Sequence, residues 1–441
     1  MNNVILKAGV MIFALGSTLG SALAQAADVP ESVIAQSFHP YANWTPEFKG
    51  YEPGVTINQA NVDQFKDILD EALYFFIKNN WVEIKTAPTT QFPLSEKYIE
   101  ASRHNGDVQL DANHTLLNYV AGRAFPAEPD AADPNAGLKL VWNYQYGFNS
   151  GDSETIYPFW WSFRNAKTGK MERRLKFEWH FLNYVHRVEF DPKPAFPENP
   201  GEIFRGIYSM VKEPFDLANT QLLIHRYQDD TKRDDAWLYL GFQRRVRRLA
   251  AGQTTDAFLG TDLMIEDFEG YNGRVADYTW EFAGTRNLLL PFYNHNEMAL
   301  SADPPNDPDG FHFIDVHGQG DCFPNVTYQL RKTYTLVGKP VDPSHPIGRR
   351  VINLDAETMT MASLITYDRK GDMWKWFPIG KTHSDNHVPA NKGKGVALDD
   401  YAVLIDIQAN HCTTLQFKSV ITDDENQPEL FNVQQLRKRS H

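Results

Sequence analysis

Two histidines and an aspartate stand close enough in the sequence to suggest a metal site. His383 and His387 lie four residues apart in THSDNHVP, with Asp385 between them. On a helix this spacing would direct both imidazoles at one metal ion. The surrounding serine, asparagine and proline instead indicate a loop, in which the spacing loses that meaning. We expect a solvated loop, and ion binding stays an open alternative.

A second segment, FHFIDVHGQGDC, could supply a general base. It holds His312 and His317 together with Asp315 and Asp321. Either histidine could act in a hydrolase, but no nucleophile partner is visible. The serine-hydrolase elbow, the Walker loop and the dinucleotide fingerprint are all missing from the sequence. We predict that the protein is not an enzyme, with a hydrolase as the alternative.

The segment DPPNDPDG offers oxygen ligands for calcium from Asp303, Asp307 and Asp309. It lacks the full spacing and the late glutamate of a helix–loop–helix calcium site. A proline-rich polar loop is the better interpretation, although calcium binding stays open. We predict no cofactor and no metal.

The chain begins with features of a secretory signal. Lys7 precedes a largely apolar stretch, and ALA and AQA offer cleavage after residue 24 or 26. We predict a signal peptide over residues 1–24 and a soluble periplasmic protein after cleavage. Cys322 and Cys412 are the only cysteines, so export favours a disulfide between them over two buried thiols.

An arginine-rich stretch, GFQRRVRRLA, interrupts a chain whose formal net charge is −13. A nucleic-acid patch would need further basic segments, so we expect no nucleic-acid partner. The acidic segment TDLMIEDFEGY follows soon after and offers carboxylates for pairing. We predict ion pairs or a docking contact at the rim of a sheet for Arg244, Arg245, Arg247 and Arg248, with Asp262, Glu266, Asp267 and Glu269 as the nearby acidic partners.

These groups must be positioned by a chain that is mainly β. Apolar residues at three- and four-residue spacing predict one helix over residues 58–80. From about residue 138 the pattern changes to period two, and short turns connect successive strands. We expect strands in LKLVWNYQYGF, RRLKFEWHFLNYVHRVEF, AWLYLGFQRRVRRL, DYTWEFAGTRNLLL, VTYQLRKTYTLVG, RRVINLDAETMTMASLITYDRKGDMWKWF, YAVLIDIQA and TTLQFKSVI.

The predicted fold is therefore α+β, with residues 27–137 as an extended arm and helix packed on a curved antiparallel sheet of residues 138–441, in one structural unit. Several strands are apolar at both parities, so both sheet faces should be covered. Aromatic side chains of one parity could converge on a concave ligand site, or form an ordinary core beneath the helix. The candidates are Trp179, Phe181, Trp237, Tyr239, Trp280, Phe282, Tyr328, Leu330 and Tyr334.

Four segments together resemble one family of Gram-negative periplasmic proteins. They are EPGVTINQANVDQFKDIL, DPNAGLKLVWNYQY, GFQRRVRRL followed by FLGTDLMIEDFEGYNGRVADYTWEFAGTRNLLLPFY, and RRVINLDAETMTMASLITYDRKGDMWK. The family is a domain of unknown function often labelled "outer membrane lipoprotein-sorting protein". Many members read RGQRRVRR where this chain has GFQRRVRR, and KTHSDNHVPANKGKG is unfamiliar.

The resemblance implies a fold like that of the lipoprotein carriers LolA and LolB, an incomplete antiparallel barrel with an apolar concave face covered by helices. It also implies a periplasmic carrier or adaptor for a hydrophobic, lipid-like ligand. Its implied partners are an inner-membrane RND-type exporter and an outer-membrane protein. A hydrolase using His312 or His317 and a structural adaptor without ligand are the alternatives.

Overall fold

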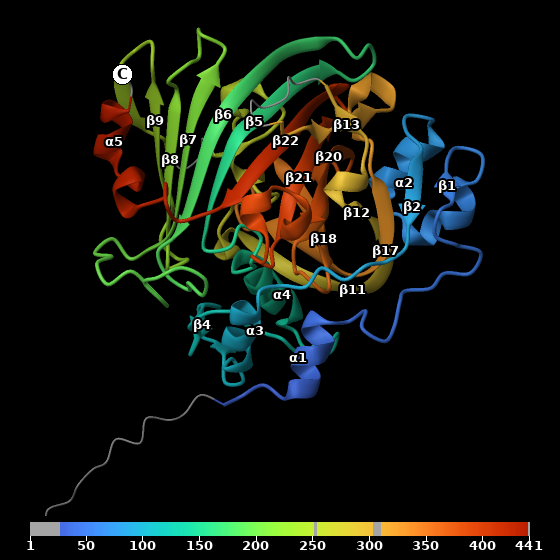
Figure 1. The fold of residues 1–441 in the computed structure, drawn as a ribbon, viewed down its shortest axis with the longest axis horizontal. Helices are drawn as coiled ribbons and strands as arrows, with labels where there is room; N and C mark the ends of the chain where they lie inside the picture. The colour runs from blue at the N-terminus through green and yellow to red at the C-terminus, as the bar shows by residue number, and fades with distance from the viewer. Residues whose placement is uncertain (1–26, 251–253, 303–309, 440–441) are drawn as a thin grey trace, which may run out of the picture.

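The computed structural model describes residues 27–250, 254–302 and 310–439, so the predicted signal peptide lies outside the described residues. A large, curved, open sheet forms the centre of the fold (Figure 1). Its first antiparallel meander consists of β5 (Ser153–Asn165), β6 (Met171–Asn183), β7 (Ile203–Glu213), β8 (Gln221–Tyr227), β9 (Asp235–Leu240) and β10 (Arg245–Arg248).

A second meander completes the sheet. It consists of β17 (Thr327–Pro340), β18 (Ile347–Asp355), β19 (Met361–Asp368), β20 (Met373–His383), β21 (Ala397–Asp406) and β22 (His411–Ile421). Its last strand, β22, pairs with β5, the first strand of the other meander. The predicted curved antiparallel sheet is thus confirmed, and this single pairing unites segments far apart in the sequence.

Shorter strands extend or flank the sheet. β1 (Thr56–Ile57), β2 (Ile84–Ala87), β11 (Tyr278–Leu290) and β12 (Phe292–Tyr293) join it, whereas β3 (Gln109–Leu110) with β4 (Leu116–Leu117), β13 (Leu300–Ser301) with β14 (Phe313–Ile314), and β15 (Val316–His317) with β16 (Phe323–Pro324) form separate pairs. The α-helices are α1 (Glu31–Phe38), α2 (Glu71–Lys78), α3 (Glu96–Arg103), α4 (Ala136–Gln145) and α5 (Val433–Lys438). Within the described ranges, no helix is long and apolar enough to span a membrane.

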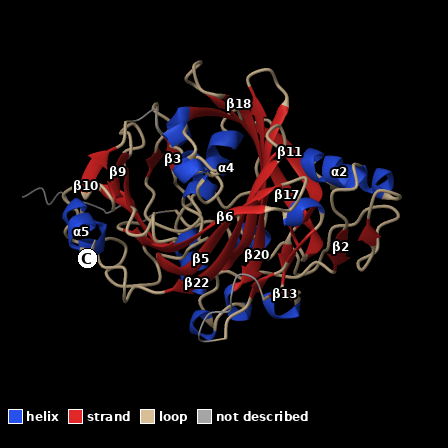
Figure 2. Cartoon of the chain, turned by 90° about the horizontal axis from the view of Figure 1, so that it is seen from above, coloured by secondary structure: helices blue, strands red, loops and turns tan. Residues whose placement is uncertain are grey.

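The concave face of the sheet is filled by the chain itself. Helix α4 lies inside the curve of the sheet (Figure 2). Beside it lies a segment with three short 3-10 helices, η3 (Phe258–Gly260), η4 (Ile265–Asp267) and η5 (Val275–Asp277). Trp142 of α4, Phe258 and Phe268 join the strand residues in one apolar core. This internal cover shields the concave face from water.

The convex face is covered as well. Phe76 of α2 packs on Trp376 of β20, with ring centroids 5.2 Å apart. Near the free edge of the sheet, Leu436 of α5 packs with Leu182 of β6. The expectation that both faces are covered is therefore confirmed, and it explains why several strands are apolar at both parities.

Four predicted elements differ from the structure. The strand expected in RRLKFEWHFLNYVHRVEF ends at Asn183, as β6. The expected strand in LKLVWNYQYGF is helix α4. Its residues Leu140, Val141, Trp142 and Tyr144 are all buried, and periodicity alone does not separate a short buried helix from a strand. The expected strand in AWLYLGFQRRVRRL is a hairpin of β9 and β10, because the chain turns at residues 241–244.

The expected helix over residues 58–80 is divided in two. A 3-10 helix, η1 (Val62–Ile68), is followed by extended backbone at Leu69 and Asp70 before α2 begins. The carboxylate of Asp70 accepts hydrogen bonds from the Leu73 backbone N–H at 2.7 Å and from the Ser363 hydroxyl at 2.6 Å. Asp70 therefore caps the start of α2 and is held by Ser363 of β19, and for this reason the chain does not form one continuous helix despite its helical periodicity.

The predicted disulfide between Cys322 and Cys412 is present. It joins the loop after η7 (Gln319–Asp321) to strand β22 on the convex side of the sheet. Both cysteines are fully buried. The bond therefore fixes a covering loop to one of the two strands that unite the meanders.

We expect loss of this disulfide to destabilise the protein by about 4 kcal/mol, because the closed loop spans 90 residues and the entropy of loop closure grows with length. The free energy of unfolding in urea, with and without reductant, measures the effect. A variant with Cys322→Ala and Cys412→Ala should be insensitive to reductant. An equal loss with reductant in that variant would contradict the prediction.

Candidate functional site

An apolar pocket opens between the concave face of the sheet and its internal cover. The free volume inside it is about 40 Å³. Strands β5, β6, β20, β21 and β22 form one wall, and the segment around η4 forms the other. The lining residues are Asn149, Ser150, Glu154, Ile156, Phe159, Trp161, Trp179, Phe181, Leu263, Phe268, Glu269, Phe377, Ile379, Asp399, Ala402, Leu415 and Phe417.

The walls of the pocket are aromatic. Phe159 stacks on Phe417 with ring centroids 4.4 Å apart, and Trp161 stacks on Trp179 at 5.9 Å. Phe268, from the internal cover, meets Trp179 edge-on at 4.9 Å. Alternate residues of β5 and β6 point to the concave face, which places these rings side by side.

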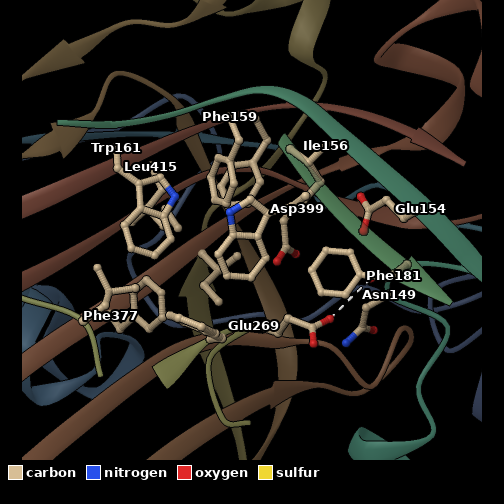
Figure 3. A pocket seen from close by; sticks show the side chains of 17 residues that line it. Asn149, Glu154, Ile156, Phe159, Trp161, Phe181, Glu269, Phe377, Asp399 and Leu415 are labelled. Atoms are coloured by element: carbon tan, nitrogen blue, oxygen red, sulfur yellow. Dashed lines mark hydrogen bonds between the residues drawn. The ribbon is translucent and has the colours of Figure 1, made fainter. Parts of the chain in front are cut away.

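The rim of the pocket is acidic on one side. Glu154, Glu269 and Asp399 gather there, opposite Trp161 (Figure 3). Two of the three are paired: Glu269 with Arg205 at 2.8 Å, and Asp399 with Lys381. The site therefore combines an aromatic interior with one polar edge that carries carboxyl groups.

Local backbone features place two of these carboxylates. Gly270, which follows Glu269, has a φ of +99°, and a Cβ there would lie 1.8 Å from the Met361 side chain. The Tyr144 hydroxyl of α4 donates to the Glu269 carbonyl at 2.8 Å. On β21, the register shifts at residue 400, so Asp399 faces the pocket and Asp400 the opposite side.

Glu154 is the buried member of the rim, with 4% of its surface exposed. Burial raises the pKa of its carboxyl to about 7; the hydroxyls of Ser419 and Ser150 lower it, and the carboxylates of Asp399 and Glu269 raise it further. Glu154 therefore changes its charge near neutral pH, at the mouth of an apolar pocket.

The structure separates the predicted ligand residues. Only Trp179 and Phe181 line the pocket. Trp280, Phe282 and Tyr334 belong to the same concave core at other places. The remaining candidates lie elsewhere: Tyr328 and Leu330 with α2, and Trp237 and Tyr239 near α5. The four strands therefore do not converge on one concavity, and Tyr328 and Leu330 instead lie in an ordinary core beneath α2, as in the alternative interpretation.

Sequence reasoning missed much of the pocket. No strand was expected in SETIYPFWWSFRN, which forms β5 and supplies Glu154, Phe159 and Trp161. Proline within the run speaks against a central strand, although Phe159, Trp161 and Phe163 alternate with period two. The rim carboxylates carry no common sequence signal, because they are separated by more than a hundred residues.

The arginines of β10 and its turn pair differently from the prediction. Their side chains are exposed, and Arg248 pairs with Asp235 of the neighbouring strand. The acidic residues that were expected to pair with them are used inside the protein. Asp262 contacts His411, Glu266 contacts His345, Asp267 contacts Arg350 and Glu269 contacts Arg205.

His383 and His387 do not share a site. His387 lies beside Asp400 at 3.2 Å, and Asp400 also pairs with His295 at 2.9 Å. The Nε2 atom of His387 accepts the Ser419 backbone N–H at 2.9 Å, so its Nδ1 carries the proton and faces Asp400. Burial lowers the pKa of His387, so its imidazole is neutral, and the proton on Nδ1 argues against metal ligation through that atom. Burial alone would lower the pKa of His295, but Asp400 raises it above its usual value.

The other chemical candidates lie away from the pocket. His312 is exposed, and His317 is half-buried on β15, where burial lowers its pKa. Neither lines the pocket. Asp315 and Asp321 flank the disulfide loop. The predicted calcium ligands Asp303, Asp307 and Asp309 lie outside the described residues.

We expect Glu154→Gln to stabilise the protein in a pH-dependent way. Folding raises the pKa of Glu154 from 4.5 to about 7, so its ionised form opposes folding; this cost is absent below about pH 4.5 and complete above about pH 7. The variant should be more stable than the wild type at pH 8, by up to about 3 kcal/mol, and nearly equal at pH 4.5. Urea unfolding at both pH values measures this; an equal difference at both would contradict it.

The family model described as "Protein of unknown function (DUF1329)" matches residues 56–437. Among solved structures, the chain is similar to a DUF1329 family protein from Desulfovibrio piger, with 16% identity, a TM-score of 0.48, and coverage of 69% of this chain and 100% of that one.

Two further solved structures are similar. One is a domain described as an outer membrane lipoprotein-sorting protein from Vibrio parahaemolyticus, with 16% identity, a TM-score of 0.46, and coverage of 69% of this chain and 100% of that one. The other is a LolA superfamily protein from Nitrosomonas europaea, with 12% identity, a TM-score of 0.37, and coverage of 64% and 91%. No curated protein matches the sequence. Because the family model covers most of the chain, in agreement with the motif resemblance, the protein belongs to the DUF1329 family.

Proposed function

We propose that this protein is a periplasmic carrier for a hydrophobic, lipid-like ligand. The observation that carries the proposal is the aromatic pocket in the concave face of the sheet. The free volume inside it is about 40 Å³, below the about 300–1,000 Å³ of most small-molecule pockets, so an acyl chain would enter only as the aromatic side chains move apart. Burying an acyl chain contributes about 0.8 kcal/mol per methylene, so binding requires no catalytic group.

The sequence supports the compartment and the partners. The signal-like residues 1–24 favour export to the periplasm. The family resemblance adds an inner-membrane RND-type exporter and an outer-membrane protein as partners. A hydrolase is less well supported, because among the described residues no histidine lines the pocket, and His312 and His317 lie elsewhere.

Filling the pocket should abolish ligand binding. Ala402 lies on the β21 wall, is 1% exposed and lines the pocket, so Ala402→Leu would occupy its space. Ala356→Leu is the matched control, because Ala356 is equally small and buried in the same core but does not line the pocket. Native mass spectrometry of protein from its host should show bound lipid in the wild type and the control, and none in Ala402→Leu.

If the wild type carries no lipid, the protein is a structural adaptor and the proposal fails. Each substitution should cost about 1–3 kcal/mol through overpacking, so ligand is counted per folded molecule. Lipid retained equally in both variants would also overturn the proposal.

A pair of tryptophans gives a second test. Trp179 lines the pocket, whereas Trp280 packs in the same core and donates to the Val275 carbonyl at 2.9 Å. Trp179→Ala and Trp280→Ala should each lose about 3–5 kcal/mol of unfolding free energy. Only Trp179→Ala should lose bound lipid per folded molecule; loss of lipid in both would mean that the core as a whole, not the pocket, holds the ligand.

A further inference from the structure

The pocket contains two buried hydrogen-bond donors that have no acceptor. The indole Nε1 atoms of Trp161 and Trp179 are buried and unpaired among the described residues, and both tryptophans line the pocket. Their side chains are 1% and 2% exposed. Such unpaired groups are costly in a protein interior, so a ligand atom that accepts from them would be favoured.

Three other buried indoles in this protein find acceptors. Trp142 donates to the His114 carbonyl and Trp280 to the Val275 carbonyl, both at 2.9 Å, and Trp376 donates to Asp70 at 3.3 Å. Trp160 is a further unpaired indole, but it does not line the pocket and lies against Lys176. The pocket therefore groups two donors that the fold leaves unpaired.

The rim of the pocket contains a carboxyl group, that of Glu154, which could contact the polar head of a ligand. Glu269 and Asp399 are already neutralised by Arg205 and Lys381. Glu154 has the Ser150 and Ser419 hydroxyls as neighbours, and the described residues give it no ion-pair partner. Figure 3 shows Glu154 on the side of the pocket opposite Trp161. A ligand head beside Glu154 would meet a carboxylate that lacks a cation.

We propose that the pocket selects amphipathic ligands with a cationic or hydrogen-bond-donating head, placed at Glu154, and with acceptor oxygens in the apolar part, placed at the indoles of Trp161 and Trp179. Ligands with an anionic head, such as free fatty acids, are rejected by the rim. This inference rests on the proposed carrier function and adds the chemical class of the ligand.

The test of the head group uses three ligands with the same twelve-carbon chain: dodecylamine, dodecanol and laurate. Their binding to delipidated protein is measured by calorimetry at pH 8, below their micelle concentrations. We expect the amine to bind at least about tenfold more tightly than laurate, with dodecanol between them. Glu154→Gln should remove most of this preference, and the exposed control Glu52→Gln should keep it.

The outcomes separate the two proposals. If none of the three ligands binds, the carrier function itself fails. If all three bind with equal affinity, or laurate binds most tightly, the carrier function stands and the head-group inference is overturned. A preference for the amine that survives in Glu154→Gln would overturn the role of Glu154.

The indole donors need a separate comparison, between methyl laurate and an alkane of equal length. The ester should bind several-fold more tightly, because its carbonyl accepts from the indoles. Trp179→Phe keeps an aromatic ring and removes one donor, so the ester's advantage should shrink. Equal binding of the ester and the alkane to the wild type would overturn this part of the inference.

Discussion

An open sheet that is apolar on both faces must be covered on both faces, and the rest of this structure depends on that constraint. If either apolar face of the sheet were exposed to water, the folded protein would be destabilised. On the convex side α2, α5 and the disulfide loop supply the cover. On the concave side the cover is α4 with the segment from η3 to η5. The pocket is the place where this internal cover and the sheet do not close completely.

The sequence predicts the parts of the fold that have regular local patterns. Strands β11, β17 and β18 to β20 follow period-two alternation with clear turn residues between them, and they lie where the pattern indicates. Helix α4 and the break before α2 were not predictable in this way. Four buried residues nearly in succession hide the helical period in α4, and the anchor of Asp70 to Ser363 is a tertiary contact.

The site was less predictable than the fold, for a topological reason. Trp179 and Phe181 were found because strand β6 has a strong alternating pattern. Glu154 and Asp399 meet only because β22 connects the two meanders, with β21 beside it. Glu269 enters from the internal cover, held by a turn that requires Gly270. No spacing within one segment of the sequence predicts that these residues lie close together.

The polar rim and the unpaired indoles lower the stability of the free protein. A buried carboxyl with a pKa raised to about 7 and two indole N–H groups without acceptors oppose folding in the free protein. Such groups often gather at functional sites, where a ligand satisfies them. In contrast, all three guanidinium nitrogens of buried Arg331 have hydrogen-bond partners, and Arg331 pairs with Asp355 outside the pocket.

The most direct measurement is a crystal structure of the protein purified from its own host without delipidation. The account predicts elongated electron density among Phe159, Trp161, Trp179 and Phe417, with its polar end at Glu154. Density for a ligand at another surface, or a pocket closed by its own side chains while bound lipid is present in the crystal, would contradict it.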